Sequence, residues 1–434
     1  MIRPSHHLLT ASFLWVLLAV AGSFWPQFAL LWLLSAGVLI TVAVLDFFLC
    51  SRRQALVLTR RLPGRFALGE DAEVMLDIRN RTGRNLELEV FDHVPDSAEA
   101  RELPWSGKLG KGSFLQLSYP VRMLERGRVT FGMTELLASS PLRLWKKRLF
   151  LGKEEEVKVY PNYEPLVELA LLATDQRIEQ MGIIRKNRIG ISKEFHQLRD
   201  YHQGDSLNQI DWKSSARRLE LISREYQEQR DQTVILAVDS GRRMRAVEGE
   251  LSQFDHCLNS MLLLSYIALR QGDNVGVIKF GGEQRWLPPV KGVHQMPVLL
   301  NHLYDYETTL EPSDFREAAE RIMVAQQKRA LVIVLTNLRG EDRDDLSQSL
   351  AQLRRRHLVV LASLREEGID QVIGDPDITS LDEALTLAGT KHYVDERKSV
   401  LATLRQGGIQ TIDETAADLP IALCNRYLDI KAEL

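Results

Sequence analysis

The sequence has few cysteine residues and little net charge. Its 434 residues include three cysteines, Cys50, Cys257 and Cys424, which are far apart and form no CxxC pair. This spacing argues against a disulfide framework or a zinc site and is typical of a reducing compartment. The formal net charge is only −3 at pH 7, so the overall charge gives no reason to expect a nucleic acid as partner.

Charge is also scarce near the N-terminus, where two long apolar runs occur. Residues 8–24 and 28–49 are nearly uncharged, and each is about long enough to cross a bilayer as a helix. Only the sequence WPQ separates them, so we expect a transmembrane hairpin in residues 1–53 rather than a cleaved signal peptide. Arginines follow the second run, which predicts a multi-pass protein of the inner (cytoplasmic) membrane, in contact with the lipid bilayer and with both termini in the cytoplasm. Asp46 is expected to reach water near the end of its helix.

Residues 54–160 have the pattern of an all-β domain. Short runs with partial alternation of apolar and polar residues, such as AEVMLDIRN and LELEVFDHV, are separated by turn sequences such as RTGRN. Five or more short strands at this spacing predict a β-sandwich of immunoglobulin or fibronectin type. This part of the sequence shows no catalytic cluster.

The pattern changes after a connecting segment, residues 161–232. In residues 233–434, apolar runs such as TVILAVDS, ALVIVLTNL and LVVLASL alternate with helical stretches. Strands that alternate with helices predict an α/β domain with a doubly wound parallel sheet and helices on both faces. Ligand sites in such sheets form beyond the carboxyl ends of the strands. Two strand ends carry polar residues here, Asp239 after the first strand and Thr336 with Asn337 after a later one.

Asp239 opens a loop that has the form of a degenerate metal site. A metal-binding loop of the D-x-S-x-S kind needs hydroxyl groups two and four residues after the aspartate, but these positions hold Gly241 and Arg243. Asn337 supplies a neutral oxygen where an aspartate is common. Mg²⁺ prefers hard oxygen ligands in near-octahedral geometry, so we expect no metal and no cofactor, with Asp239 paired to a local arginine or capping the next turn. Metal-dependent ligand binding at Asp239 is the alternative.

A second candidate site lies upstream, in the sequence LRDYHQGDSLNQIDWKSSARR. Asp200, His202 and Asp205 could form the acid–base group of a hydrolase. No nucleophile elbow, phosphate loop or HExxH motif accompanies them. HQGD is also a typical turn sequence, and Asp211 could cap a helix. We therefore favour a structural or interaction role and predict that the protein is not an enzyme.

The same segment resembles the signature of the domain of unknown function 58 family, R-x-Y-x-x-G-D-x-x-x-x-I-x-W-x-x-S-A-R. The matching residues are Arg199, Tyr201, Gly204, Asp205, Ile210, Trp212, Ser215, Ala216 and Arg217. The segments 125–145 and 272–282 are similar to further landmarks of the family, so the resemblance covers essentially the whole chain. It implies a von Willebrand A-like domain at residues 233–434 and partnership with a MoxR-type AAA+ ATPase, often beside transglutaminase-like membrane proteins.

These features together predict a membrane-anchored, non-enzymatic adaptor that faces the cytoplasm and presents its von Willebrand A-like domain to the ATPase. Within the signature, Asp205, Trp212 and Arg217 could form a partner surface, because aromatic residues and arginine dominate interface energetics. They could instead form a structural clasp in which the tryptophan is buried. We favour the clasp for Trp212 and a mixed role for Arg217.

Overall fold

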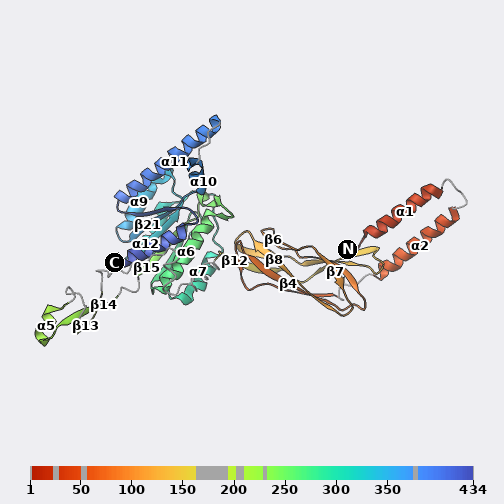
Figure 1. The fold of residues 1–434 in the computed structure, drawn as a ribbon, viewed down its shortest axis with the longest axis horizontal. Coiled ribbons are helices and arrows are strands. Elements are labelled where there is room, and N and C mark those ends of the chain that lie inside the picture. Colours follow the sequence, from red (N-terminus) through yellow and green to blue (C-terminus); the bar gives the residue numbers. More distant parts are fainter. Residues whose placement is uncertain are drawn as a thin grey trace. The chain divides into compact units, whose positions relative to one another are not determined.

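The computed structural model describes residues 2–22, 29–49, 56–162, 194–201, 210–227, 232–374 and 380–433. Within these ranges only the backbone is described at residues 21–22, 29–31, 194–197, 199, 224–227 and 370–371. The chain forms two compact units, Met1–Tyr160 and Pro161–Leu434. Figure 1 follows both units by colour along the chain, and each is described by itself.

The first unit contains two helices and strands arranged in three sheets. Its elements are β1 (Ile2–Pro4), α1 (His6–Gly22), α2 (Ala29–Phe48), β2 (Leu56–Arg61), β3 (Phe66–Ala67), β4 (Asp71–Asn80), β5 (Leu86–Phe91), β6 (Ala98–Ala100), β7 (Trp105–Leu109), β8 (Phe114–Met123), β9 (Gly127–Phe131), β10 (Thr134–Ser139), β11 (Trp145–Leu151) and β12 (Glu155–Tyr160). The two larger sheets have the strand orders β1-β11-β10-β5-β7 and β2-β4-β8-β6, and the third has the order β3-β12-β9. Strands therefore fill the part of the chain in which the alternating sequence predicted them.

Alternation of side chains explains how these strands form a core. On β4, Val74, Leu76 and Ile78 are completely buried, whereas Glu73 and Arg79 are exposed. Successive side chains of a strand point to opposite faces of the sheet, so one face of β4 is apolar and faces inward.

A buried polar network connects the two larger sheets. Nε of Arg60, on β2, donates to Oδ2 of Asp92, just after β5, at 3.0 Å. The hydroxyl of Tyr119, on β8, donates to the same oxygen at 2.5 Å, and the hydroxyl of Thr134, on β10, donates to Oδ1 at 2.8 Å. Burial, together with the Asp92 charge, raises the pKa of Tyr119. Because every partner is desolvated, this network depends on all its members being present.

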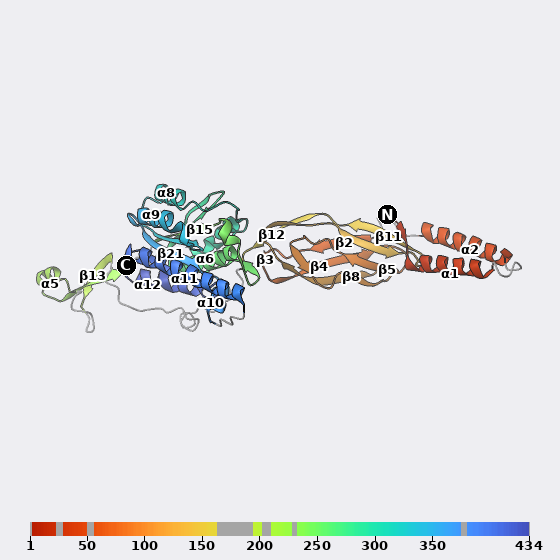
Figure 2. The ribbon, with the colours of Figure 1, turned by 90° about the horizontal axis from the view of Figure 1, so that it is seen from above.

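The helices α1 and α2 occupy the two apolar runs near the N-terminus (Figure 2). Among the residues that the structure describes, no helix combines the length and the apolar character needed to cross a membrane. The predicted transmembrane hairpin of residues 1–53 is therefore wrong, and so are the predicted membrane anchoring and the multi-pass inner-membrane location, which rested on it.

Two features of these helices differ from the predicted hairpin. The 17 residues of α1 extend about 26 Å at 1.5 Å per residue, less than the roughly 30 Å of a hydrocarbon core. The C-terminal part of α2 is bound to the β-structure instead. Asp46 is buried and accepts hydrogen bonds from the Ser140 hydroxyl and from the backbone N–H of Leu142 at 3.0 Å. The indole N–H of Trp145 donates to the carbonyl of Ala43 at 2.8 Å. The expectation that Asp46 reaches water is wrong as well.

The second unit contains a β-hairpin with a short helix, followed by an α/β sheet. Its elements are β13 (Glu194–Asp200), α5 (Trp212–Arg218), β14 (Ile222–Gln227), β15 (Thr233–Asp239), η4 (Arg242–Arg245), β16 (Val247–Glu248), β17 (Leu251–Ser252), α6 (Gln253–Arg270), β18 (Asn274–Phe280), β19 (Arg285–Lys291), η5 (Val293–Gln295), α7 (Met296–Leu303), α8 (Phe315–Ala325), β20 (Leu331–Thr336), η6 (Gly340–Asp342), α9 (Arg343–Arg354), β21 (Leu358–Leu364), α10 (Glu367–Gly374), α11 (Leu381–Gln406), β22 (Gln410–Glu414) and α12 (Leu419–Glu433).

The six-stranded sheet has the order β19-β18-β15-β20-β21-β22. All its neighbouring strands are parallel except β18 and β19, which are antiparallel and show a register shift between Val275 and Val277. Ile235 and Ala237 of β15 belong to a core shared with α8, α9 and α11. Figure 2 shows α8 and α9 on one face of the sheet and α6 and α12 on the other. This arrangement brings the carboxyl ends of β15 and β20 side by side.

Candidate functional site

Asp239 lies at the carboxyl end of β15 and is completely buried. Its Oδ1 accepts hydrogen bonds from the backbone N–H of Gly241 at 2.8 Å and from the hydroxyl of Ser313. Its Oδ2 accepts one from the hydroxyl of Thr336 at 2.6 Å. Both carboxylate oxygens are therefore engaged by protein donors. Of the two roles predicted for Asp239, capping of the next turn agrees with the Gly241 bond.

Gly241 is the residue where a metal-binding loop would carry a hydroxyl. A Cβ atom at this position would lie 2.2 Å from Oγ of Ser313 and 3.1 Å from Oδ1 of Asp239. The space is thus filled by Ser313, which comes from the segment before α8, 74 residues away in the sequence. Nothing in the local sequence around Asp239 indicates this residue, and the sequence analysis missed it.

Arg243 pairs with Asp342 rather than with Asp239. Its Nη1 and Nη2 donate to the two carboxylate oxygens of Asp342, with Nη2 at 2.9 Å from Oδ1. Nη1 also donates to the carbonyl of Asn337 at 3.3 Å. Burial lowers the pKa of Arg243, while the neighbouring Asp239 charge raises it. This bidentate pair fastens the loop after β15 to η6.

Asn337 uses both ends of its side-chain amide inside the protein. Nδ2 donates to Oε1 of Gln253 at 2.7 Å and to Oε1 of Glu366 at 2.8 Å. Oδ1 accepts from Nη1 of Arg397 at 3.2 Å. An aspartate here would lose both donated bonds, so the amide fits this position better than the acid of a metal site would.

Arg397, on α11, is the centre of the network at this end of the sheet. Its side chain is only 2% exposed. Its guanidinium donates to Asp413, Asn337, Tyr393 and Ser363 and to the carbonyls of Leu338 and Leu364. Burial acts to lower the pKa of Arg397, but the hydrogen bonds with Asp413 and the charges of Asp413, Tyr393 and Glu366 together outweigh it, so the pKa is raised. Arg397 therefore remains charged and joins α11 to β20, β21 and β22.

The residues at this edge hold together the loops that follow β15 and β20. No group of three or more histidine, cysteine, aspartate or glutamate side chains that could hold a metal occurs in the described part of the chain. Cys257 has a thiol close enough to Asp239 to be affected by its charge. Burial, together with that charge, raises the pKa of Cys257. A thiol held in its protonated form is a poor nucleophile.

We expect Gly241→Ser to destabilise the second unit by about 1–3 kcal/mol, because the new side chain must displace the Ser313 hydroxyl from Asp239. Gly368→Ser is the matched control, since a Cβ at Gly368 meets no atom within 4 Å. The double variant Gly241→Ser/Ser313→Gly should recover part of the loss. Thermal unfolding measures all three, and equal stability of both serine variants would contradict the prediction.

The structure describes only part of the signature segment. Gly204, Asp205 and His202 lie outside the described residues, and Arg199 is described by its backbone alone. Asp200 ends β13 and is exposed. The proposed acid–base group of Asp200, His202 and Asp205 is therefore not tested by this geometry.

The residues that are described connect α5 to β14 through hydrogen bonds and two buried isoleucines. Asp211 caps α5, as predicted, because its Oδ1 accepts from the backbone N–H of Ser214 at 3.0 Å. The Ser215 hydroxyl donates to the carbonyl of Asp211 at 2.8 Å and accepts from the N–H of Ile222 at 2.9 Å. Ile210 and Ile222 are buried. Ser215 and Ile210 of the signature thus have structural roles.

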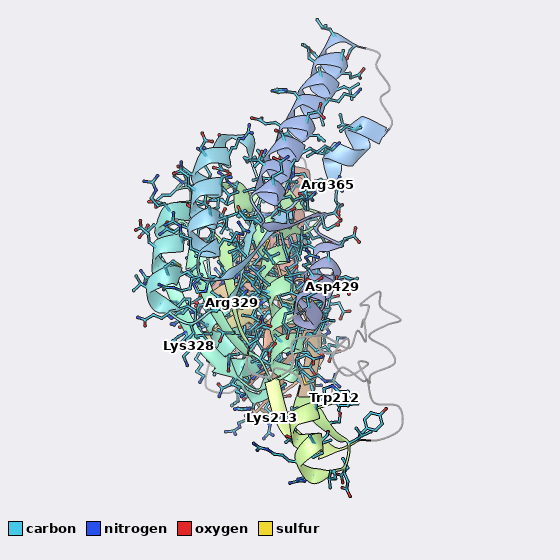
Figure 3. All side chains as sticks on the ribbon, turned by 90° about the vertical axis from the view of Figure 1, so that its left-hand side faces the viewer. Trp212, Lys213, Lys328, Arg329, Arg365 and Asp429 are labelled. Carbon is cyan, nitrogen blue, oxygen red and sulfur yellow. The ribbon has the colours of Figure 1, made fainter. Side chains whose placement is uncertain are left out.

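Trp212 is different, because its side chain faces solvent. It is 66% exposed, and Leu219, at the other end of α5, is 92% exposed. Leu198 and Leu221 are also exposed, and Lys213 and Arg217 lie on the same helix. Figure 3 shows Trp212 and Lys213 as sticks on α5. The clasp that we favoured for Trp212 requires a buried ring and is wrong.

The chain thus combines a β-sheet unit with an α/β unit that carries an exposed signature helix. The family model described as "Protein of unknown function DUF58" matches residues 197–388. The curated relative YeaD of Bacillus subtilis (strain 168), an uncharacterized protein, is 23% identical over 251 residues, which are 57% of this chain and 59% of YeaD. These two matches support the assignment of the chain to the DUF58 family. The match spans less than two thirds of that relative's length.

Two solved structures are each similar to about a quarter of the chain. A fragment of α2-macroglobulin from Escherichia coli is 22% identical, with 24% of this chain and 16% of that chain covered and a TM-score of 0.20. A FixG-related protein from Vibrio parahaemolyticus is 10% identical, with 24% and 96% covered and a TM-score of 0.18. Scores this low identify neither a fold nor a function.

Proposed function

We propose that the protein is a non-enzymatic adaptor that binds a partner protein through its signature module, defined as β13, α5 and β14. The observation that carries this proposal is the exposure of Trp212 and Leu219, 66% and 92%, at the two ends of one short helix. Exposed large apolar side chains that lie close together are typical of interaction sites. Tryptophan and arginine are also the residue types that contribute most to interface energies, and Arg217 lies on the same helix.

The geometry of the α/β sheet supports a role without catalysis. At its carboxyl edge, where such sheets usually bind substrates, the Asp239 carboxylate, the Asn337 amide and the Arg397 guanidinium are all committed to internal hydrogen bonds. A general base or nucleophile needs a free lone pair directed at a substrate. The internal hydrogen bonds of these three residues are better suited to keeping this edge of the sheet rigid, so that a partner can bind its surface.

The proposed partner is a MoxR-type AAA+ ATPase, to which the α/β domain would be presented as a von Willebrand A-like module. The match of residues 197–388 to the DUF58 family model supports this partner, because the signature's resemblance to that family implies it. The parallel sheet with helices on both faces supports a von Willebrand A-like domain. The ATPase would supply the chemical energy, and the adaptor would supply recognition.

Affinity purification of the full-length protein with the ATPase tests the proposal. We expect Trp212→Ala and Leu219→Ser each to weaken retention of the ATPase by roughly 30-fold, or about 2 kcal/mol, while the unfolding temperature stays unchanged. The matched control is Leu310→Ser, because Leu310 is 75% exposed in the same unit but lies outside the module. Wild-type retention by both module variants would refute the proposal. A lowered unfolding temperature would instead indicate a structural role.

A further inference from the structure

A hollow of about 500 Å³ opens beside Arg243 at the carboxyl edge of the sheet. Its lining consists of Arg242, Arg243, Arg339, Gly340, Glu341, Tyr393 and Glu396. Three arginines at one opening attract anions, since guanidinium groups bind carboxylates and phosphates through paired N–H donors. How each arginine is neutralised decides which of them can accept a ligand.

Two of these arginines are held in place by internal partners. Arg243 is buried and forms its bidentate pair with Asp342. Arg339 donates from Nη2 to Oε1 of Glu366 at 2.8 Å, and its guanidinium carbon lies 5.2 Å from the ring centroid of Tyr393. These contacts hold two sides of the hollow in place and neutralise both guanidinium charges, so Arg242 is the one of the three arginines that is left to bind an anion.

In the part of the chain that the structure describes, Arg242 is held by a backbone hydrogen bond and a loose ionic contact. Its N–H donates to the carbonyl of Glu311 at 3.1 Å. Its side chain is 60% exposed, and Nη2 lies 3.9 Å from Oε1 of Glu341. The same Glu341 oxygen lies 3.7 Å from Nη2 of Arg243. Both distances exceed those of a hydrogen bond, so Glu341 lies between two guanidinium groups without bonding to either.

We propose that this hollow binds a carboxylate side chain of the partner protein and that Glu341 is its internal competitor. This inference rests on the proposed adaptor function and specifies the chemistry of the partner. An incoming glutamate or aspartate would take the position of the Glu341 carboxylate and make the bidentate contact with Arg242 that Glu341 does not make.

The surrounding charges select a carboxylate over a phosphate. Glu341, Glu396 and Asp342 are all at or next to the hollow. A partner carboxylate brings one negative charge to these three groups, whereas a phosphate dianion would bring two. The Glu396 side chain packs beside Gly340, since its Cδ would lie 2.1 Å from a Cβ built on that glycine.

A fluorescein-labelled hexaglutamate peptide tests the site directly by fluorescence anisotropy on the full-length protein. We expect Arg242→Ala to weaken binding about tenfold and Glu341→Gln to strengthen it about threefold, since one removes a charged donor and the other removes the competitor. A labelled hexamer of phosphoserine should bind more weakly than hexaglutamate. Tighter binding of the phosphopeptide would overturn the assignment to a carboxylate.

The chain supplies closely matched controls for both variants. Arg316 is 65% exposed and its Nη2 lies 3.9 Å from Oδ1 of Asp345, the same degree of exposure and the same distance as in the pair of Arg242 and Glu341. Arg316→Ala and Asp345→Asn should leave the affinity for hexaglutamate within about twofold of wild type, because exposed pairs of this kind contribute little. If Arg242→Ala and Arg316→Ala weaken binding equally, the effect is general electrostatics and the inference is wrong.

Retention of the ATPase by the same variants separates this inference from the proposed function. If Trp212→Ala releases the ATPase while Arg242→Ala changes neither retention nor peptide affinity, the adaptor function stands and the carboxylate site falls. The wild-type protein could instead retain no ATPase, while Arg242→Ala weakens hexaglutamate binding and Arg316→Ala does not. In that case the carboxylate site is supported and the proposed identity of the partner is wrong.

Discussion

Arg397→Ala is expected to destabilise the α/β unit by about 3–5 kcal/mol, the usual cost of removing one partner from a buried charged network. The substitution leaves Asp413 without its guanidinium partner and removes one donor each from Asn337 and Ser363. Arg397→Lys should recover only part of this loss, because a single ammonium group cannot reach acceptors on three strands at once.

Hydrogen exchange measured by mass spectrometry as a function of urea gives the stability of each unit separately, which a global unfolding curve does not. Peptides from β20 and β21 should lose protection in Arg397→Ala, while peptides from β4 and β8 should not. Arg405→Ala is the control on the same helix, since Arg405 is exposed and bonds to Thr411. It should change stability by less than about 0.5 kcal/mol. Equal effects of the two variants would contradict the central role of Arg397.

Asp92→Ala should lower the free energy of unfolding of the first unit by a similar amount, again about 3–5 kcal/mol. Asp92 accepts hydrogen bonds from Arg60, Tyr119 and Thr134. Its removal leaves a guanidinium buried without a counter-charge between two sheets. Here the protection of β4 and β8 should fall, and that of β20 and β21 should stay.

Asp71→Ala is the matched control for Asp92→Ala. Asp71 also pairs with an arginine, Arg101, but both side chains are about half exposed and their atoms are 3.3 Å apart. Such a pair contributes at most about 1 kcal/mol. A small effect of Asp92→Ala, no larger than that of Asp71→Ala, would show that the network between the sheets is not a main source of stability.

The local sequence predicted the strands well because a strand is a local pattern. The runs around Ile235 and Ile333 are continuous apolar stretches, and both are buried central strands of the sheet. The same reasoning correctly located Asp239 at a strand end. It missed Ser313 and Arg397 because their partners lie 74 and 60 residues away in the sequence, and no spacing rule connects such positions.

The errors have a common physical origin, since each concerns where a residue's partners are. The apolar runs near the N-terminus indicated membrane spans, but the partners of Asp46 are 94 and 96 residues away in the sequence, at Ser140 and Leu142. We also favoured a clasp with a buried ring for Trp212. In the structure, α5 is only seven residues long and buries a single side chain, that of Ser215, so it has no apolar face on which a tryptophan could be covered.

The edge strand β19 limits how any partner can approach the sheet. Its sequence, RWLPPVK, contains Pro288 and Pro289 in succession, and proline has no backbone N–H to donate. An extended segment of another chain needs an unbroken row of donors and acceptors to add itself to a sheet edge. The gap at the two prolines blocks such growth, which also protects the protein from edge-to-edge aggregation. A partner must therefore recognise side chains on this unit rather than prolong its sheet through β19.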